Sequence, residues 1–240
     1  MWEGKKVSVI FPTYNEKDSI RGAINDFFKS GLVDEILVVN NNAAEGTKEE
    51  VEKTKARQVF ETKQGYGYAI RRGFKEVKGD LIIIAEPDGT FLGKDVIKLL
   101  AYSDDVDVVF GTRTHTAMIQ KGANMGMFIK WGNWFVAKIM QFLFNTDRFS
   151  DAGCTMRLLS RKALEKIEPK FVNGGSNFGL EMMLHIINIK ITYLEVPLTY
   201  EKRVGESSVT GSKVKAFILG LDMIWLVFSY RMKTLFKRFF

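Results

Sequence analysis

The 240-residue chain has little that could cross-link or stiffen it: it contains one cysteine, Cys154, and four prolines. One cysteine excludes a disulfide within the chain and favours a reducing compartment. A chain of this length buries about 70–75% of its unfolded surface, so a core forms without disulfides or structural metals. Its composition, 46% hydrophobic and 26% charged, excludes a disordered protein and suits one large domain, or one domain with an appendage.

Long apolar runs are also missing. No stretch reaches about 18 uninterrupted apolar residues, so we expect no ordinary membrane-spanning helix. The first apolar run, in MWEGKKVSVIFPTYNE, is too short for a signal peptide, and a proline and polar residues follow it at once. The 28 acidic residues are fewer than the 35 basic ones, and the net charge of +7 favours anionic partners such as nucleotides, phospholipids or phosphorylated acceptors.

Short apolar runs typical of buried strands alternate with segments of helical spacing in the first half of the chain. We expect strands at 6–11, 34–39, 57–61, 80–85 and 106–110, and helices at 17–29, 47–55, 68–77 and 94–101. This alternation predicts βαβ crossovers and a doubly wound α/β fold with a mostly parallel sheet. Further along, we expect helices at 123–144, 160–167 and 176–189, a strand at 190–196, a charged loop at 197–212 and a last helix from 213.

Polar loops follow the first four expected strands. They are Pro12–Glu16, Asn40–Asn42, Gln64–Gly67 and Glu86–Asp88. Because the carboxyl ends of parallel strands meet at one edge of a sheet, and ligands bind there, these loops predict a binding site.

Glu86 and Asp88 place two carboxylates, two residues apart, directly after the most apolar strand. Mg²⁺ and Mn²⁺ prefer hard oxygen ligands and commonly bridge carboxylates to a diphosphate, whose departure they assist as Lewis acids. An ordinary acidic turn is the alternative interpretation, but the position at the sheet edge favours a metal site.

Six segments together resemble family 2 glycosyltransferases of the GT-A fold. They are FPTYNE, VVNNNAAEGT, EPDGT and GTR, followed by SDAGCTMRLLSRKAL and VPLTYEKRVGESS, which resemble the polyprenyl-phosphate (dolichol-phosphate) mannosyl- and glucosyltransferase branch. The resemblance implies an inverting enzyme that moves a hexose from a nucleotide sugar, of GDP-mannose or UDP-glucose type, to polyprenyl phosphate. It also implies a GT-A catalytic domain over residues 1–212, with an interfacial helix near 123–144, and a C-terminal amphipathic helix over 213–240.

The resemblance also assigns residues to the donor. The nucleotide would contact Pro12, Tyr14, Glu16, Asn40, Asn41 and Pro87. Asn40 and Asn41 stand where the family usually has two aspartates; a plain turn is the alternative for them. The metal, Mg²⁺ or Mn²⁺, would be bound by Glu86 and Asp88, with Thr90 at the position of a glutamine that often assists.

On the acceptor side, the resemblance places Arg113, Lys130 and Arg203 at the lipid phosphate, and Arg157 is a further basic candidate. Arginine suits bidentate phosphate contact, although a surface charge is the alternative for each of these residues. Asp151 is a general-base candidate if the acceptor is a hydroxyl, and orients an arginine if the acceptor is a phosphate. We count Asp88, Arg113, Asp151 and Arg203 as the catalytic candidates.

Two late segments, 125–144 and 216–228, are aromatic and apolar with basic residues among or beside them. Such helices suit a lipid interface, and core or dimerising helices are the alternative. We therefore expect peripheral attachment to the cytoplasmic face of the cell membrane, with a homo-oligomer possible. A sugar-hydroxyl or glycolipid acceptor, or an inactive GT-A scaffold that binds nucleotide or membrane, are the rival functions. Nucleic acid is not an expected partner, because the basic residues cluster on apolar helices.

Overall fold

The structure is a computed structural model that describes residues 1–123, 125–205 and 212–239. The end of the expected 197–212 loop, which includes the last three residues of VPLTYEKRVGESS, lies outside the described residues, as do residues 124 and 240.

Seven strands form one sheet in the order β3-β2-β1-β4-β6-β5-β7. The strands are β1 (Val7–Thr13), β2 (Glu35–Asn40), β3 (Arg57–Phe60), β4 (Leu81–Ile84), β5 (Val108–Thr112), β6 (Arg157–Ser160) and β7 (Tyr193–Pro197). All neighbours are parallel except β6, which runs antiparallel to both β4 and β5. The expected strands are therefore present. Strand β6, whose apolar part is only two residues long, was not predicted.

The helices are α1 (Lys17–Lys29), α2 (Thr47–Glu52), α3 (Tyr66–Glu76), α4 (Val96–Leu100), α5 (Met127–Phe144), α6 (Arg161–Ile167), α7 (Phe178–Asn188) and α8 (Lys213–Phe239). Short 3₁₀ turns lie at Gly93–Asp95, Thr116–Met118 and Glu168–Lys170. The long aromatic helix begins at Met127 rather than near 123, and α3 begins at Tyr66 rather than Tyr68.

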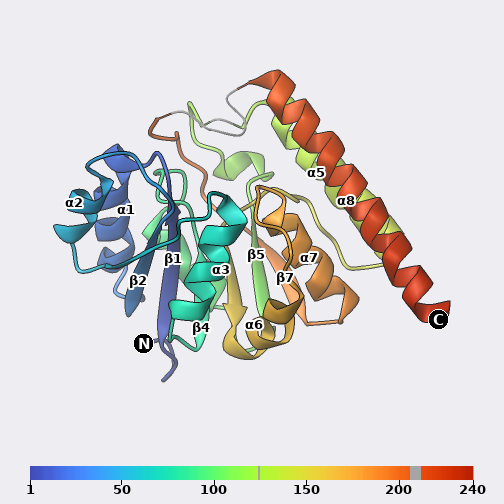
Figure 1. Ribbon diagram of the computed structural model, residues 1–240, viewed down its shortest axis with the longest axis horizontal. Coiled ribbons are helices and arrows are strands. Elements are labelled where there is room, and N and C mark those ends of the chain that lie inside the picture. Colours follow the sequence, from blue (N-terminus) through green and yellow to red (C-terminus); the bar gives the residue numbers. More distant parts are fainter. Residues whose placement is uncertain (124, 206–211, 240) are drawn as a thin grey trace.

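Helices cover both faces of the sheet (Figure 1). Alternate residues of each strand point to opposite faces, so Val9 packs with α1, α2 and α4, whereas Ile10 packs with α3, α6 and α7. Two cores result, which is why the central strands β1, β2 and β4 are mostly apolar rather than alternating.

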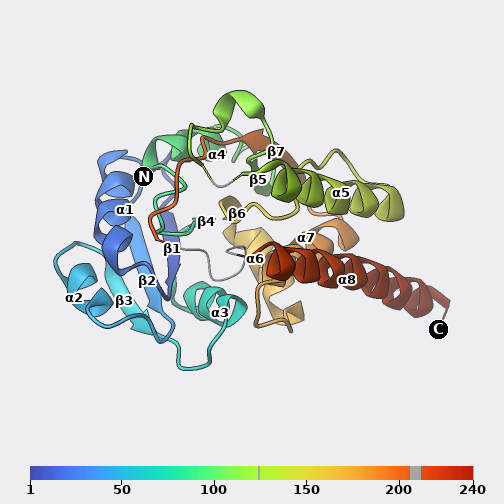
Figure 2. The same ribbon diagram turned by 90° about the horizontal axis from the view of Figure 1, so that it is seen from above.

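Helices α5 and α8 lie side by side and extend beyond the sheet, as Figures 1 and 2 show from two directions. Val136 and Met140 of α5, with Met223 and Val227 of α8, belong to the core on the α7 side. Within residues 1–123, 125–205 and 212–239, none of the helices has the length and apolar character needed to cross a bilayer.

Proline in a central strand normally removes a ladder hydrogen bond. Strand β1 lies between β2 and β4, but its pairing with β4 stops at Ile10, opposite Ile84. Pro12, two residues later, pairs only with Val39 of β2. Pro12 therefore lacks an N–H only where β4 has already ended, so no hydrogen bond of the sheet is lost. The polar loop follows directly after β1.

Candidate active site

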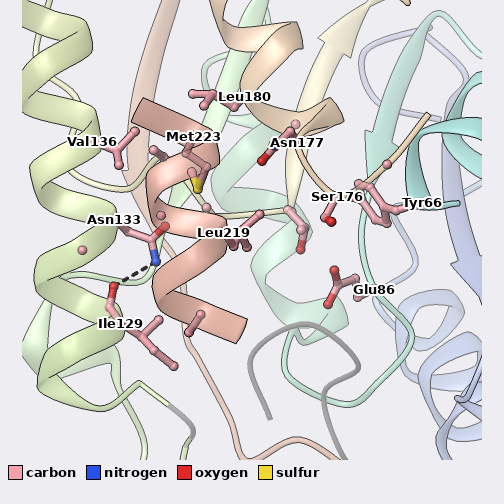
Figure 3. Close-up of a pocket in the computed structure, with 18 of the residues that line it drawn as sticks. Tyr66, Glu86, Ile129, Asn133, Val136, Ser176, Asn177, Leu180, Leu219 and Met223 are labelled. Carbon is pink, nitrogen blue, oxygen red and sulfur yellow. Dashed lines mark hydrogen bonds between the residues drawn. The ribbon is translucent and has the colours of Figure 1, made fainter. Parts of the chain in front are cut away.

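A cavity of about 660 Å³ lies at the edge of the sheet where the parallel strands end. Its polar part is lined by residues from the loops after β1, β2, β3, β4 and β5, including Glu16, Asn41, Gln64, Glu86 and Arg113. Its other part is lined by apolar side chains of α5 and α8. Figure 3 shows Glu86, Ser176 and Asn177 near one end, and Val136, Leu219 and Met223 near the other.

The acid pair occupies the loop after β4. Glu86 lines the cavity, whereas Asp88 is fully buried. Gly89 takes a φ of +83°, a left-handed conformation that suits glycine. The backbone N–H and the hydroxyl of Thr90 both donate to Asp88 Oδ1, at 2.9 and 2.6 Å. Thr90 therefore holds Asp88 and is not among the residues that line the cavity.

Arg203 contacts both acids. Its guanidinium lies 2.8 Å from Glu86 Oε2 and 2.5 Å from Asp88 Oδ2. The Asp88 contact lacks hydrogen-bond alignment, so the buried Oδ2 accepts no hydrogen bond. Burial, followed by the Asp88 carboxylate, raises the pKa of Glu86 to about 7 despite the opposing charge of Arg203.

These features fit a divalent cation. Two adjacent acids, one with an unsatisfied buried oxygen and the other with a raised pKa, gain from positive charge beyond what one guanidinium supplies. Among the described residues no group of three or more His, Cys, Asp or Glu side chains could hold a metal. A cation here would therefore need further ligands from a bound diphosphate or from water.

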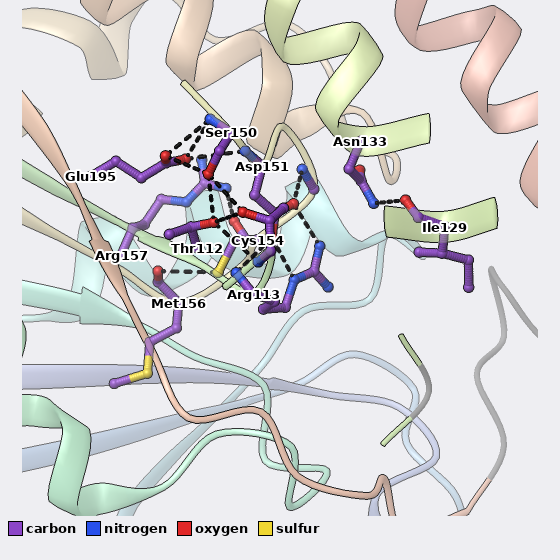
Figure 4. Close-up of polar contacts among 12 residues, drawn as sticks. Thr112, Arg113, Ile129, Asn133, Ser150, Asp151, Cys154, Met156, Arg157 and Glu195 are labelled. Carbon is purple, nitrogen blue, oxygen red and sulfur yellow. Dashed lines mark hydrogen bonds and ion pairs between the residues drawn. The ribbon is translucent and has the colours of Figure 1, made fainter. Parts of the chain in front are cut away.

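Arg113 and Asp151 form a buried bidentate pair. Arg113 Nε donates to Asp151 Oδ2 and its NH2 donates to Oδ1, both at 2.9 Å, while the Arg113 backbone N–H also donates to Oδ2 (Figure 4). Burial alone would raise the pKa of Asp151, but the Arg113 guanidinium outweighs it and holds that pKa below its usual value. Asp151 is thus an ionised partner that orients Arg113 towards the cavity.

Arg157 reaches the cavity because β6 is antiparallel. Arg157 is the first residue of β6 and lies opposite Ile84 and Phe110, near the ends of β4 and β5. The Arg157 side chain is buried and donates to the backbone carbonyls of Cys154 and Gly179. Among the described residues it has no carboxylate partner, and burial lowers its pKa. A buried cation without an anion therefore lines the cavity.

The loop after β1 forms part of the polar end of the cavity. Glu16 Oε2 accepts from the Tyr14 and Asn15 backbone N–H groups, at 2.6 and 3.0 Å, and from the Thr13 hydroxyl. The carboxylate thereby holds the loop in place. Pro12, Tyr14 and Glu16, which the resemblance assigns to the nucleotide, all line the cavity.

Asn40, the last residue of β2, and Asn41, which follows it, hydrogen-bond mainly to backbone groups. Asn41 Nδ2 donates to the carbonyls of Glu61 and Lys63, and its Oδ1 accepts from Gly65 and Gln64. Its amide is saturated, so Asn41 joins the β2 and β3 loops at the cavity wall. Asn40 Oδ1 accepts from the Ala43 backbone N–H.

Some predicted residues lie away from the cavity. Asn40, Pro87 and Lys130 are not among its lining residues. Lys130, on α5, donates to the Thr116 hydroxyl at 2.9 Å. The structure therefore brings together Pro12, Tyr14, Glu16, Asn41, Glu86, Arg113 and Arg203 at the cavity, with Asp88 and Asp151 immediately behind.

Glu195 on β7 was not expected from the sequence. Its carboxylate accepts from the Ser150 and Asp151 backbone N–H groups and from the Ser150 hydroxyl. Its own strand pattern, YLEVP, gave only the weak signal of a charged residue inside an apolar strand.

The fold is an α/β sheet whose polar loops gather at the edge where the parallel strands end, which is where ligands bind in such folds. The chain belongs to glycosyl transferase family 2, whose model matches residues 8–168. The expected family and GT-A fold are thereby confirmed.

Curated relatives agree with this family. The low-salt glycan biosynthesis hexosyltransferase Agl6 of Haloferax volcanii is 29% identical over 209 residues, 85% of this chain and 49% of that protein. The dolichyl-phosphate beta-glucosyltransferase of Saccharomyces cerevisiae is 25% identical over 248 residues, 90% of this chain and 71% of that protein. The chain thus spans about half the length of the first relative.

Solved structures share the fold. The glucosyl-3-phosphoglycerate synthase of Mycobacterium tuberculosis, in complex with Mn²⁺, UDP-glucose and phosphoglyceric acid, superposes with a TM-score of 0.73 at 15% identity. The match covers 95% of this chain and 80% of that one.

Proposed function

We propose that this chain is an inverting glycosyltransferase that moves a hexose from a nucleotide sugar to the phosphate of a polyprenyl lipid at a membrane surface. The single observation that carries the proposal is the two-ended cavity. Acidic and basic side chains line its polar end, and apolar side chains of α5 and α8 line the other. A lipid phosphate matches this combination, since its head is an anion and its tail is apolar.

The polar residues suit a reaction between two anions. One acceptor phosphate oxygen would attack the anomeric carbon, and the bond from that carbon to the diphosphate would break, with the electron pair leaving on the nucleoside diphosphate. Arg113 and Arg203 would orient the acceptor and offset its charge, while the attacking oxygen stays ionised. A divalent cation held by Glu86 and Asp88 would supply charge neutralisation on the leaving diphosphate.

The Arg113–Asp151 pair favours a phosphate acceptor over a hydroxyl. A general base needs a carboxylate free to take a proton, ideally with a raised pKa. Asp151 instead accepts four hydrogen bonds, three from Arg113 and one from the Gly153 backbone N–H, and its pKa is lowered. A lipid phosphate needs no base, because it is already ionised near neutral pH, with a second pKa of about 6.

The comparisons support the substrate classes. A relative bears the name dolichyl-phosphate beta-glucosyltransferase, and a structure with the same fold is described with Mn²⁺ and UDP-glucose. The first of these supports a lipid-phosphate acceptor, and the second supports a nucleotide-sugar donor with Mg²⁺ or Mn²⁺.

Helices α5 and α8 support contact with a membrane. Large apolar side chains are exposed on both, including Trp131, Trp134 and Phe142 on α5, and Phe217, Trp225 and Phe236 on α8. Exposed apolar residues at this density are unusual on a monomeric surface and mark interaction sites. Lys215 and Lys233 of α8 are also exposed, which suits anionic headgroups. We propose that α5 and residues 213–240 lie in the lipid interface, where the acceptor's tail enters the cavity.

The test uses the full chain with Mn²⁺, radiolabelled UDP-glucose or GDP-mannose, and phosphatidylcholine vesicles containing either farnesyl phosphate or farnesol. We expect label in the lipid fraction with the phosphate only, in a product labile to mild acid. Transfer to farnesol or to a glycolipid would contradict the acceptor assignment. Calorimetric binding of the sugar nucleotides without turnover on any lipid phosphate would instead favour an inactive scaffold.

A further inference from the structure

The Ser150–Asp151 loop is attached to the end of β7 by one carboxylate. Glu195 accepts from the Ser150 backbone N–H at 2.9 Å, from the Ser150 hydroxyl at 2.7 Å and from the Asp151 backbone N–H at 3.1 Å. All three partners donate, so the arrangement uses Glu195 as an ionised acceptor. Figure 4 shows Glu195 and Arg113 on opposite sides of this loop.

The loop in turn holds Arg113. Asp151 follows Ser150, the residue that donates to Glu195. The two carboxylate oxygens of Asp151 accept from the Arg113 guanidinium at 2.9 Å each. Strands β5 and β7 are parallel neighbours, with Phe110 opposite Glu195. Arg113, three residues beyond Phe110, and Glu195 are thus fixed to the same part of the sheet, and the loop is clamped between them.

A chain of hydroxyl groups reinforces the clamp. Ser150 Oγ, which donates to Glu195, lies 2.8 Å from both Thr112 Oγ1 and Thr114 Oγ1. These threonines flank Arg113. Because one hydroxyl proton is committed to Glu195, Ser150 is available to accept from a threonine on the other side. The direction of the hydrogen bonds among these three hydroxyl groups therefore depends on the Glu195 carboxylate.

We propose that Glu195 is a positioning residue for the acceptor: it fixes the Ser150–Asp151 loop, and Asp151 fixes the Arg113 guanidinium that faces the cavity. The assignment of Arg113 to the acceptor phosphate rests on the proposed function, whereas the dependence of Arg113 on Glu195 does not. Arg113 is the residue that would contact the acceptor. Glu195 does not line the cavity and acts on Arg113 through the Ser150–Asp151 loop and the Asp151 carboxylate.

The clamp is sensitive to pH in the neutral range. Burial is the main cause that raises the pKa of Glu195 to about 7, and the Asp151 carboxylate adds to it. The other ionisable groups in this network are Arg113, paired with Asp151, and Tyr193 on the same strand. Asp147 lies beside Tyr193, and Arg157 lies across Phe110 from Glu195. Protonation removes an acceptor oxygen facing three donors, so acidification below about 7 loosens the loop.

The first measurement needs no substrate. In ¹⁵N-arginine-labelled protein, the Arg113 Nε–H signal, assigned with Arg113→Lys, reports the bond to Asp151. We expect its protection factor, relative to free arginine at the same pH, to fall in Glu195→Gln and in wild type below pH about 7. Glu86→Gln controls for the other acid that titrates in this range and should keep the wild-type pH dependence. Unchanged protection in Glu195→Gln would overturn the proposal.

The second measurement uses transfer to farnesyl phosphate. We expect Glu195→Gln to raise the acceptor KM by about tenfold to a hundredfold, the equivalent of one charge-assisted hydrogen bond, with the donor KM unchanged. Glu165→Gln, an exposed site on α6, is the matched control. Ser150→Ala keeps two backbone donors to Glu195 and should give a smaller rise; it serves if Glu195→Gln fails to fold.

The outcomes separate the two proposals. Equal rises in the donor and acceptor KM of Glu195→Gln, or an effect equal to that of Glu165→Gln, would overturn the positioning role. Loss of Arg113 protection in Glu195→Gln, together with no transfer to farnesyl phosphate by wild type, would keep the clamp and refute the proposed acceptor.

Discussion

Replacing Asp151 with asparagine should both destabilise the protein and weaken acceptor binding. The Asp151 side chain is fully buried and that of Arg113 is 11% exposed, so water screens the pair little. Removing one partner of such a pair leaves an uncompensated charge and costs about 3–5 kcal/mol. Arg113 lines a cavity that water can enter, so we expect a value near the lower end, about 3 kcal/mol.

For a domain of this size, each kcal/mol lowers the melting temperature by about 2–4 °C. We therefore expect Asp151→Asn to melt roughly 6–12 °C lower than wild type, and its free energy of unfolding in urea to fall by about 3 kcal/mol. Asp105→Asn, at an exposed position, should leave both values unchanged. The double variant Asp151→Asn/Arg113→Gln should recover part of the loss, because neither charge is then left alone.

Kinetics complete the test. If Asp151 orients Arg113, Asp151→Asn raises the KM for farnesyl phosphate and leaves that for the sugar nucleotide unchanged. If Asp151 is a general base, kcat falls instead, and a hydroxyl acceptor is used by wild type. Wild-type stability in Asp151→Asn, or a loss that simply adds to that of Arg113→Gln, would refute the reasoning.

The remaining predictions concern the metal, the donor loop and the lipid interface. Asp88→Asn should abolish calorimetric Mn²⁺ binding and transfer while the melting temperature stays within a few degrees; retained Mn²⁺ binding would contradict the site. Burial and Asp88 raise the pKa of Glu86 to about 7. The free energy of unfolding of the metal-free protein in urea should therefore fall as the pH rises from the usual pKa of glutamate to about 7. The affinity for Mn²⁺ should rise over the same range. Glu86→Gln should remove the pH dependence of Mn²⁺ affinity and reduce the fall in stability, to which Glu195, with a pKa also raised to about 7, contributes the rest. Asn41→Asp sets an acceptor against two backbone carbonyls and should cost about 1–3 kcal/mol in urea unfolding; a neutral result would contradict the saturated amide. Trp225→Ser (74% exposed) should weaken sedimentation with anionic vesicles, whereas Val172→Ser (81% exposed), remote from α5 and α8 in sequence, should not.

The sequence predicted the elements that arise from local patterns. Apolar runs and helical spacing indicated six of the seven strands and the helices between the first five, because burial on both faces leaves a continuous apolar signal in the central strands. The edge where these strands end followed from parallel order, and it brought Tyr14, Glu16, Glu86 and Arg113 to one cavity as expected.

What the sequence could not predict are contacts between distant segments. Strand β6 is short, and only its antiparallel pairing with β4 and β5 places Arg157 at the site. Lys130 was expected at the acceptor, but the rotation of α5 turns it towards Thr116. Asn41 was expected to contact the nucleotide through its amide, which the β3 loop occupies instead.

The sequence by itself determined the fold class, the order of loops at the edge and the acid pair, because each depends on residues within one strand and its loop. Tertiary structure alone decided how α5 and α8 close the apolar end of the cavity, and how Glu195 grips a loop 45 residues away in sequence. Those contacts depend on strand register and helix docking, which are set by packing of the whole core and leave no local periodicity to detect.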